Sequence, residues 1–105
     1  MSDFKKHYLG QVFLKKNSRA IDAMIRGIAH GRVLEIGPGK GVLTKRLVLI
    51  VNDLRAVEID SGLCMELRDN LSHQKNITIY NCNFLDRPEL ALGRYIIGSL
   101  PYSSS

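Results

Sequence analysis

The chain reads VLEIGPGKGVLT from Val33 to Thr44. Residues 32–36 form a short β-prone run, and the five residues that follow include three glycines. Apolar residues return at helical spacing from Val42, so we predict a strand, a glycine loop and a helix in that order. Glycines at such a turn let the backbone approach a ligand closely, and open α/β sheets bind ligands at the carboxyl ends of their strands. This stretch therefore predicts both the fold class and the position of a binding site.

A carboxylate closes the next predicted strand, which covers residues 54–59. Glu58 stands 21 positions after Gly37, where an acidic side chain can accept hydrogen bonds from the ribose hydroxyls of a nucleoside. The pattern predicts a cofactor that contains adenosine. Dinucleotide-binding loops have the spacing G-x-G-x-x-G, whereas the third glycine here, Gly41, comes one position early. An oxidoreductase that binds NAD is therefore the second interpretation at this point.

The rest of the chain repeats the alternation of helix and strand. A helix should start at Asn17 or Ser18 and end near His30-Gly31, because Ala20, Ile21, Met24, Ile25 and Ile28 recur at helical spacing. A second helix, capped by Asp60 or Ser61, should run to Leu71, and further strands are predicted over residues 76–80 and 94–98. Such alternation predicts an α/β fold with a parallel sheet in the order 3-2-1-4. The fourth strand would leave an apolar edge.

Composition sets the class of protein. The chain has 105 residues, of which 45% are hydrophobic, and a formal net charge of +5. It is long enough for one small domain with a core. A basic surface favours the binding of polyanions, but net charge alone is weak evidence for such a partner. Cys64 and Cys82 fit no metal-binding pattern, so we predict two buried thiols and no metal site. No apolar run approaches the roughly 20 residues of a membrane span, and residues 47–51 are predicted to be a buried segment. We expect a cytoplasmic protein without a membrane anchor.

Four motifs in order carry a resemblance to a known family. They are LGQVFL at residues 9–14, VLEIGPGKGVLT at 33–44, AVEID at 56–60 and SLPY at 99–102. The chain resembles the ribosomal RNA adenine N6,N6-dimethyltransferases, and it is similar to macrolide-resistance methyltransferases and to mitochondrial transcription factors of the same fold. The resemblance runs from Lys6 to Tyr102 and covers about the first half of such a protein. It implies a Rossmann-like class I methyltransferase fold, here a truncated sheet of about four strands, as one incomplete domain over residues 1–105.

The resemblance implies S-adenosylmethionine (SAM) as the cofactor and ribosomal RNA of the small subunit as the partner of a monomeric enzyme. Gln11 would hold the methionine end, Glu58 the ribose and Ile59 the adenine ring, while Asn83 takes the place of an Asp that accepts from the adenine amino group. The cofactor-binding set that the family implies is Gln11, Leu14, Glu35, Gly37, Gly39, Gly41, Glu58, Ile59, Asn83, Phe84 and Ser99.

The resemblance also implies a catalytic segment. The family pattern Asn-Leu-Pro-Tyr reads Ser99, Leu100, Pro101 and Tyr102 here. N6 of the target adenine attacks the sulfonium methyl group in line, a reaction that needs positioning more than a strong base. Tyr102 would stack on the flipped base, and Ser99 offers a shorter side chain to the amine than Asn does. Ser99 and Asn83 depart from the family pattern, and they favour the alternative of a non-catalytic SAM-binding module in ribosome assembly or transcription.

Overall fold

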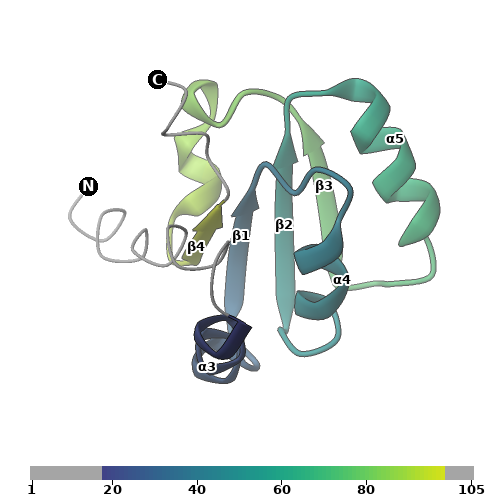
Figure 1. Ribbon diagram of the computed structural model, residues 1–105. Helices are drawn as coiled ribbons and strands as arrows, with labels where there is room; N and C mark the ends of the chain where they lie inside the picture. Colours follow the sequence, from purple (N-terminus) through teal and green to yellow (C-terminus); the bar gives the residue numbers. More distant parts are fainter. Residues whose placement is uncertain (1–17, 99–105) are drawn as a thin grey trace.

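A computed structural model describes residues 18–98 of the chain (Figure 1). Its elements are α3 (Ser18–Ile28), β1 (Arg32–Ile36), α4 (Val42–Leu47), β2 (Asp53–Glu58), α5 (Ser61–Asn70), β3 (Ile77–Asn81), the 3-10 turns η1 (Phe84–Asp86) and η2 (Pro88–Ala91), and β4 (Tyr95–Gly98). These bounds confirm each predicted strand and helix to within about one residue at most ends. Among the described residues, none of the helices has the length and hydrophobicity of a membrane span.

The four strands form one parallel sheet in the order β3-β2-β1-β4, which confirms the predicted topology. β1 lies in the centre, with Ile36 beside Val57 of β2 and beside Gly98 of β4. The chain moves from β1 outward to β3 and then returns to the other side of β1. The strand order thus reverses between β1 and β4, and ligands of doubly wound sheets bind beyond the carboxyl ends of the strands at such a point.

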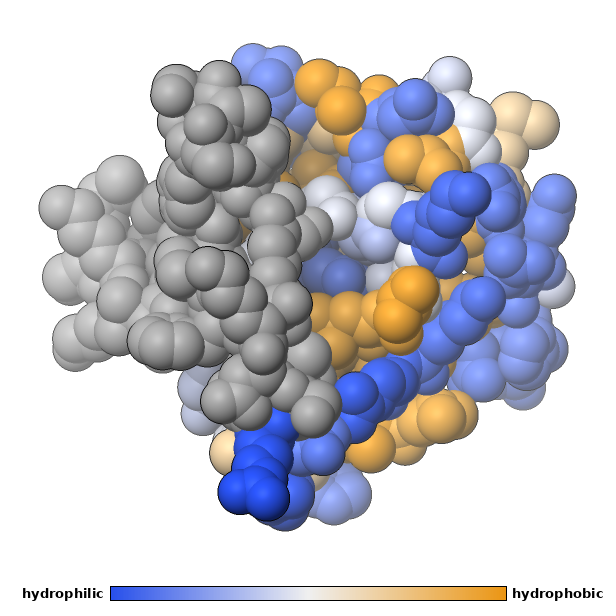
Figure 2. Space-filling model, viewed as in Figure 1, coloured by the Kyte–Doolittle hydropathy of each residue, from blue (hydrophilic) through white to orange (hydrophobic). Residues whose placement is uncertain are grey.

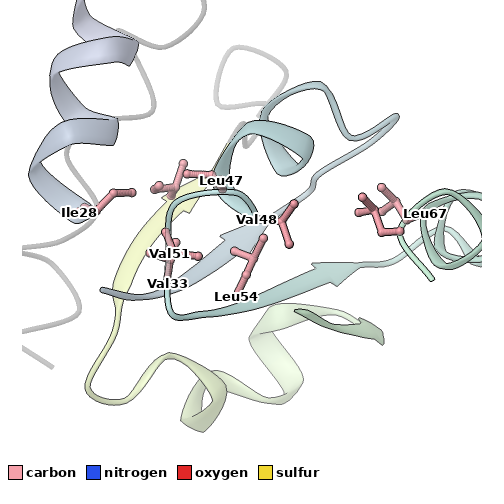
Figure 3. Packing of buried hydrophobic residues seen from close by; sticks show 9 residues of the cluster. Ile28, Val33, Leu47, Val48, Val51, Leu54 and Leu67 are labelled. Carbon is pink, nitrogen blue, oxygen red and sulfur yellow. The ribbon is translucent and has the colours of Figure 1, made fainter. Parts of the chain in front are cut away.

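The core has two layers, because successive residues of a strand point to opposite faces of the sheet. On one face Val33 and Leu54 pack against α3, α4 and α5 (Figure 3). On the other face Leu34 and Ile36 pack against η1 and η2. Full burial of one aliphatic side chain of this size contributes about 1.5–3 kcal/mol. The three α-helices therefore cover one face of the sheet, and the two 3-10 turns cover the other.

Several local predictions are corrected. In residues 47–51 the side chain of Leu49 is 73% exposed rather than buried, because the segment leaves α4 in a turn. Cys64 is buried, but Cys82 is only half-buried. In α3 the predicted apolar face is confirmed for Ile25 and Ile28, which lie against the core. The side chains of Ala20, Ile21 and Met24 lie outside the described part.

A buried arginine connects the amino-terminal ends of β1, β2 and β4. Arg94, only 3% exposed, forms an ion pair with the Asp53 carboxylate and donates to the Val33 carbonyl at 3.2 Å. This is where the predicted fourth strand differs from the observed one, which begins at Tyr95. The side chain of Arg94 thus holds β4 in place beside β1 and β2.

Candidate functional site

The glycine loop follows β1 at the carboxyl edge of the sheet, as predicted. Gly37, Gly39 and Gly41 have φ angles of 68°, 59° and 85°, which lie in the left-handed region. A Cβ atom at Gly41 would lie 2.6 Å from Leu67 Cδ2, so this glycine is also required for contact with α5. A Cβ atom at Gly39 would meet nothing within 4 Å. The loop is therefore packed on α5 at its end and open at Gly39, where a ligand can approach the backbone.

The Glu58 carboxylate joins the end of β2 to the glycine loop. Its Oε1 accepts from the backbone N–H of Gly39 at 3.0 Å, and its Oε2 accepts from the backbone N–H of Asp60 at 3.0 Å. The residue is 6% exposed. Each carboxylate oxygen has a second lone pair, so the group can accept further hydrogen bonds while it holds both amides.

Asn81 positions the end of β2, and the sequence analysis did not single it out. Its Nδ2 donates to the carbonyl oxygens of Glu58 at 3.0 Å and Ile59 at 3.1 Å. The Cys64 thiol also donates to the Glu58 carbonyl, at 3.3 Å. Asn81 is the register partner of Glu58 in the parallel pair of β2 and β3. A polar residue at the end of β3, opposite a predicted functional acid, was the sequence signal for it.

Glu35 lies beneath the loop and is the second-last residue of β1. Its Oε1 accepts from the Thr44 hydroxyl at 2.6 Å, and both residues are buried. The pKa of Glu35 is raised to about 7, chiefly because the carboxyl is buried; the Thr44 hydrogen bond opposes this rise and the neighbouring Glu58 adds to it. The sequence analysis missed Thr44, whose signal is a hydroxyl on the core side of α4, one turn after Gly41. The pair ties α4 to β1 directly under the glycines.

The residues predicted to hold the adenine lie beyond β2 and β3 at the same edge of the sheet. Ile59 is 67% exposed, so its apolar side chain is accessible at this edge. Asn83 is exposed, and its Oδ1 accepts from the backbone N–H of Leu85 at 3.0 Å, which leaves one lone pair of the amide oxygen. Phe84 is buried in the core with residues of η2 and β1, so its side chain is not exposed at the edge.

Other predicted site residues lie outside the described residues and stay predictions. They are Gln11, Leu14, Ser99, Leu100, Pro101 and Tyr102. Between residues 18 and 98, no group of three His, Cys, Asp or Glu side chains could hold a metal ion. The structure therefore brings together Glu35, the three loop glycines, Glu58, Ile59 and Asn83 at the carboxyl edge.

Comparison with known proteins agrees with this geometry. The family model described as ribosomal RNA adenine dimethylase matches residues 2–105. The chain is 32% identical over 112 residues to ribosomal RNA small subunit methyltransferase A of Trichormus variabilis. This alignment covers 95% of this chain and 39% of the relative.

Two solved structures share the fold. A dimethyladenosine transferase from Plasmodium falciparum matches with a TM-score of 0.67 and 25% identity over 86% of this chain and 34% of that one. The 23S rRNA methyltransferase ErmE matches with a TM-score of 0.56 and 33% identity over 67% of this chain and 30% of that one. The chain thus spans well under half the length of the proteins it resembles. By its sequence and by the fold around its glycine loop, this chain belongs to the ribosomal RNA adenine dimethylase family.

Proposed function

We propose that this chain is the cofactor-binding part of a SAM-dependent enzyme that dimethylates N6 of adenines in small-subunit ribosomal RNA. The observation that carries the proposal is the contact of the Glu58 carboxylate with the Gly39 amide. It places an acid that can accept from ribose directly beside the open part of the glycine loop. Because the chain belongs to this family, we expect this reaction and an RNA substrate. A cytoplasmic location and a monomeric SAM-binding domain over residues 1–105 belong to the same proposal.

The residues at the carboxyl edge fit SAM better than a dinucleotide. A pyrophosphate needs backbone N–H groups at a helix N-terminus, but the Gly41 amide already donates to the Pro38 carbonyl at 3.0 Å and the Gly39 amide to Glu58. SAM has no phosphate and brings hydroxyls to the free lone pairs of Glu58 and an adenine ring to the exposed Ile59. The remaining lone pair of the Asn83 amide oxygen can accept from the adenine amino group.

The chain's own part in the chemistry is positioning. When bound, SAM supplies an electrophilic methyl group on its sulfonium sulfur. Glu58 and the loop hold the nucleoside end in one orientation, and the buried Glu35–Thr44 hydrogen bond keeps α4 and the loop fixed to β1. An in-line transfer depends on this fixed geometry, since a bound near-attack arrangement removes much of the entropic barrier. By resemblance, Tyr102 would stack on the target base, and the shorter Ser99 stands in place of the Asn that accepts from the amine.

Isothermal titration calorimetry with S-adenosylhomocysteine tests the cofactor site. This ligand lacks the transferred methyl group but retains the ribose, the adenine and the amino acid part. We expect saturable binding that weakens at least roughly tenfold in Glu58→Ala, because two hydroxyl contacts to a charged acceptor are lost. Glu66→Ala, which removes an exposed carboxylate from α5, serves as the matched control and should bind like the wild type. A folded chain that does not bind, or equal binding by both variants, contradicts the proposal.

The reaction is tested separately on a full-length protein that contains this chain. Radiolabelled methyl groups should pass from SAM to adenines of small ribosomal subunits that lack these methyl groups. Transfer to large subunits only, or no transfer at all, contradicts the proposed substrate while leaving the cofactor site in place.

A further inference from the structure

Asn83 stands where the chain leaves β3 at the carboxyl edge of the sheet. β3 ends at Asn81, whose side chain donates to the carbonyls of Glu58 at 3.0 Å and Ile59 at 3.1 Å. The ends of β2 and β3 are therefore joined, and Asn83 follows only two residues later. In Figure 1 the chain after β3 crosses this edge of the sheet on its way to η1 and η2. Asn83 thus lies beside the region in which the proposed function places the nucleoside of the cofactor.

The surface around Asn83 suits a flat ring that is apolar on its faces. The aliphatic side chains of Ile59 and Leu85, in the segments that follow β2 and β3, are 67% and 80% exposed. Figure 2 shows hydrophobic atoms exposed beside hydrophilic ones at the top of the view, which is the carboxyl edge of the sheet in Figure 1. Apolar contacts of this kind supply area, whereas a few polar groups decide which ligand is accepted. The base of a nucleoside at this edge is therefore distinguished by the polar side chain that meets its rim.

The hydrogen bond that Asn83 already makes decides what its amide can offer to a ligand. Oδ1 accepts from the Leu85 N–H at 3.0 Å as the cap of η1, so the oxygen keeps one lone pair. A flipped amide would turn Nδ2 toward this N–H, donor against donor, so the cap fixes the orientation. Within the described part of the chain, the two N–H groups of Nδ2 have no partner. The side chain therefore presents donors together with a single acceptor position.

We propose that Asn83 gives the cofactor site a relaxed base specificity, so that the site accepts a nucleoside with a 6-oxo purine as well as one with a 6-amino purine. The 6-amino group of adenine is a donor and meets the remaining lone pair of Oδ1. The 6-oxo group of hypoxanthine is an acceptor and meets an N–H of Nδ2. A carboxylate has only acceptors, so an aspartate at this position would repel the 6-oxo group and select adenine. This inference rests on the proposed function, because it concerns the base of the same cofactor.

Isothermal titration calorimetry with two ligands tests the specificity. S-adenosylhomocysteine has the 6-amino group, whereas S-inosylhomocysteine has the 6-oxo group and a proton on N1. For the wild-type chain we expect dissociation constants within about tenfold of each other. For Asn83→Asp we expect the ratio of the two constants to rise by at least about tenfold in favour of S-adenosylhomocysteine, because the 6-oxo group loses its donor. The N1 proton is the same in every variant, so the change in the ratio reports on position 6 of the base.

The variant preserves the local fold, and a matched control separates its charge from its position. Aspartate caps a helix as well as asparagine does, so Asn83→Asp should keep the hydrogen bond from the Leu85 N–H. Asn52→Asp makes the same replacement at an exposed residue before β2, at the amino edge of the sheet. It should leave the ratio of the two dissociation constants unchanged, because a distant exposed charge is screened. An equal rise of the ratio in both variants would show that net charge controls specificity and would overturn the role of Asn83.

The same titrations separate this inference from the proposed function. A wild-type chain that binds S-adenosylhomocysteine more than about tenfold tighter than S-inosylhomocysteine overturns the relaxed specificity. Equal ratios in the wild type and in Asn83→Asp overturn the assignment of specificity to Asn83. In both cases S-adenosylhomocysteine still binds, so the proposed cofactor site stands. If the folded wild-type chain binds neither ligand, the proposed function is overturned and this inference with it.

Discussion

The backbone N–H of Gly39 donates to the carboxylate of Glu58 across 19 positions of sequence, at 3.0 Å. The contact links the loop after β1 to the end of β2, so two neighbouring strands hold the loop in one conformation. A hydrogen bond to a charged group contributes about 1.5–3 kcal/mol, more than a neutral one. Glu58 therefore has two tasks in the proposed site: it presents oxygen atoms to the ribose and it shapes the loop that receives the rest of the cofactor.

Two glycines outside helices and strands offer a matched test of the loop. Gly39 and Gly93 have φ angles of 59° and 72°, and a Cβ atom at either would meet nothing within 4 Å. Alanine at either position should lower the free energy of unfolding by about 1–2 kcal/mol, because only backbone strain is added. Urea unfolding measures this, and calorimetry should show that Gly39→Ala alone weakens S-adenosylhomocysteine binding. Equal ligand affinity in the two variants would mean that Gly39 is not part of the site.

Two asparagines make similar contacts in different places. Asn81 donates to the carbonyls of Glu58 and Ile59, while Asn76 donates to the carbonyls of Val48 and Val51 at 2.7 and 3.0 Å. Replacement of either by alanine should lower the free energy of unfolding by about 1–3 kcal/mol, since two carbonyls lose one hydrogen bond each.

The two asparagine variants should differ in cofactor binding. Because Asn81 fixes the backbone that carries Glu58 and Ile59, Asn81→Ala should also weaken S-adenosylhomocysteine binding, and Asn76→Ala should not. Unfolding curves and calorimetry on both variants check this. Loss of stability in Asn81→Ala with full ligand affinity would show that the asparagine is structural only.

Glu35 should make the stability of the chain depend on pH. Burial raises its pKa from 4.5 to about 7 in the folded state. Below the pKa of Glu35 in the unfolded chain, this carboxyl is protonated in both states, and its contribution to the free energy of unfolding is fully present. As pH rises through the window from 4.5 to 7, the unfolded state loses its proton first, so the folded state binds more protons and the free energy of unfolding falls, by about 3 kcal/mol.

Glu35→Gln checks the sign of this effect. The variant keeps an oxygen that accepts from Thr44 but has no proton to lose. Urea unfolding at pH 5 and at pH 8 should show a smaller loss of stability for the variant than for the wild type between these two values. A wild-type chain that loses no more stability than the variant between pH 5 and pH 8 would contradict a raised pKa.

Arg94 should be the arginine whose loss costs the most stability. It is buried and joins β1, β2 and β4 through Val33 and Asp53, so Arg94→Met leaves a half-buried carboxylate and two carbonyls without this partner. We expect the free energy of unfolding to fall by about 3 kcal/mol. Arg87→Met, which breaks the exposed ion pair with Glu89, should cost far less, because solvent screens exposed charges. Similar midpoints of urea unfolding for both variants would contradict this account.

Much of the fold was predictable because its signals are local. The glycine loop, the alternation of apolar residues and the cap at Asp60, whose side chain accepts from Leu63 N–H at 2.9 Å, each act within a few residues. The strand order followed from alternation of strand and helix together with general rules of topology. The first residue of β4 was less predictable, since the backbone N–H of Arg94 donates to the Ala91 carbonyl at 3.1 Å in the turn before the strand.

The candidate site was predictable in part. Glu35, Glu58 and the glycines came from motif spacing, and the structure places them together at one edge of the sheet. Thr44 and Asn81 were missed, because their roles depend on partners in other elements. The cofactor roles of all these residues stay predictions, which the binding of S-adenosylhomocysteine tests.

The sequence by itself determined the family, the strand order and the position of the loop, because glycine spacing and apolar periodicity follow from the local geometry of strands and turns. Only the tertiary structure decided which groups the acids meet. Glu58 binds Gly39, Glu35 binds Thr44 and Asp22 binds Arg46 across 19, 9 and 24 positions. Such contacts depend on how separate elements pack, and hydrogen bonds and ion pairs act only over a few ångströms in space.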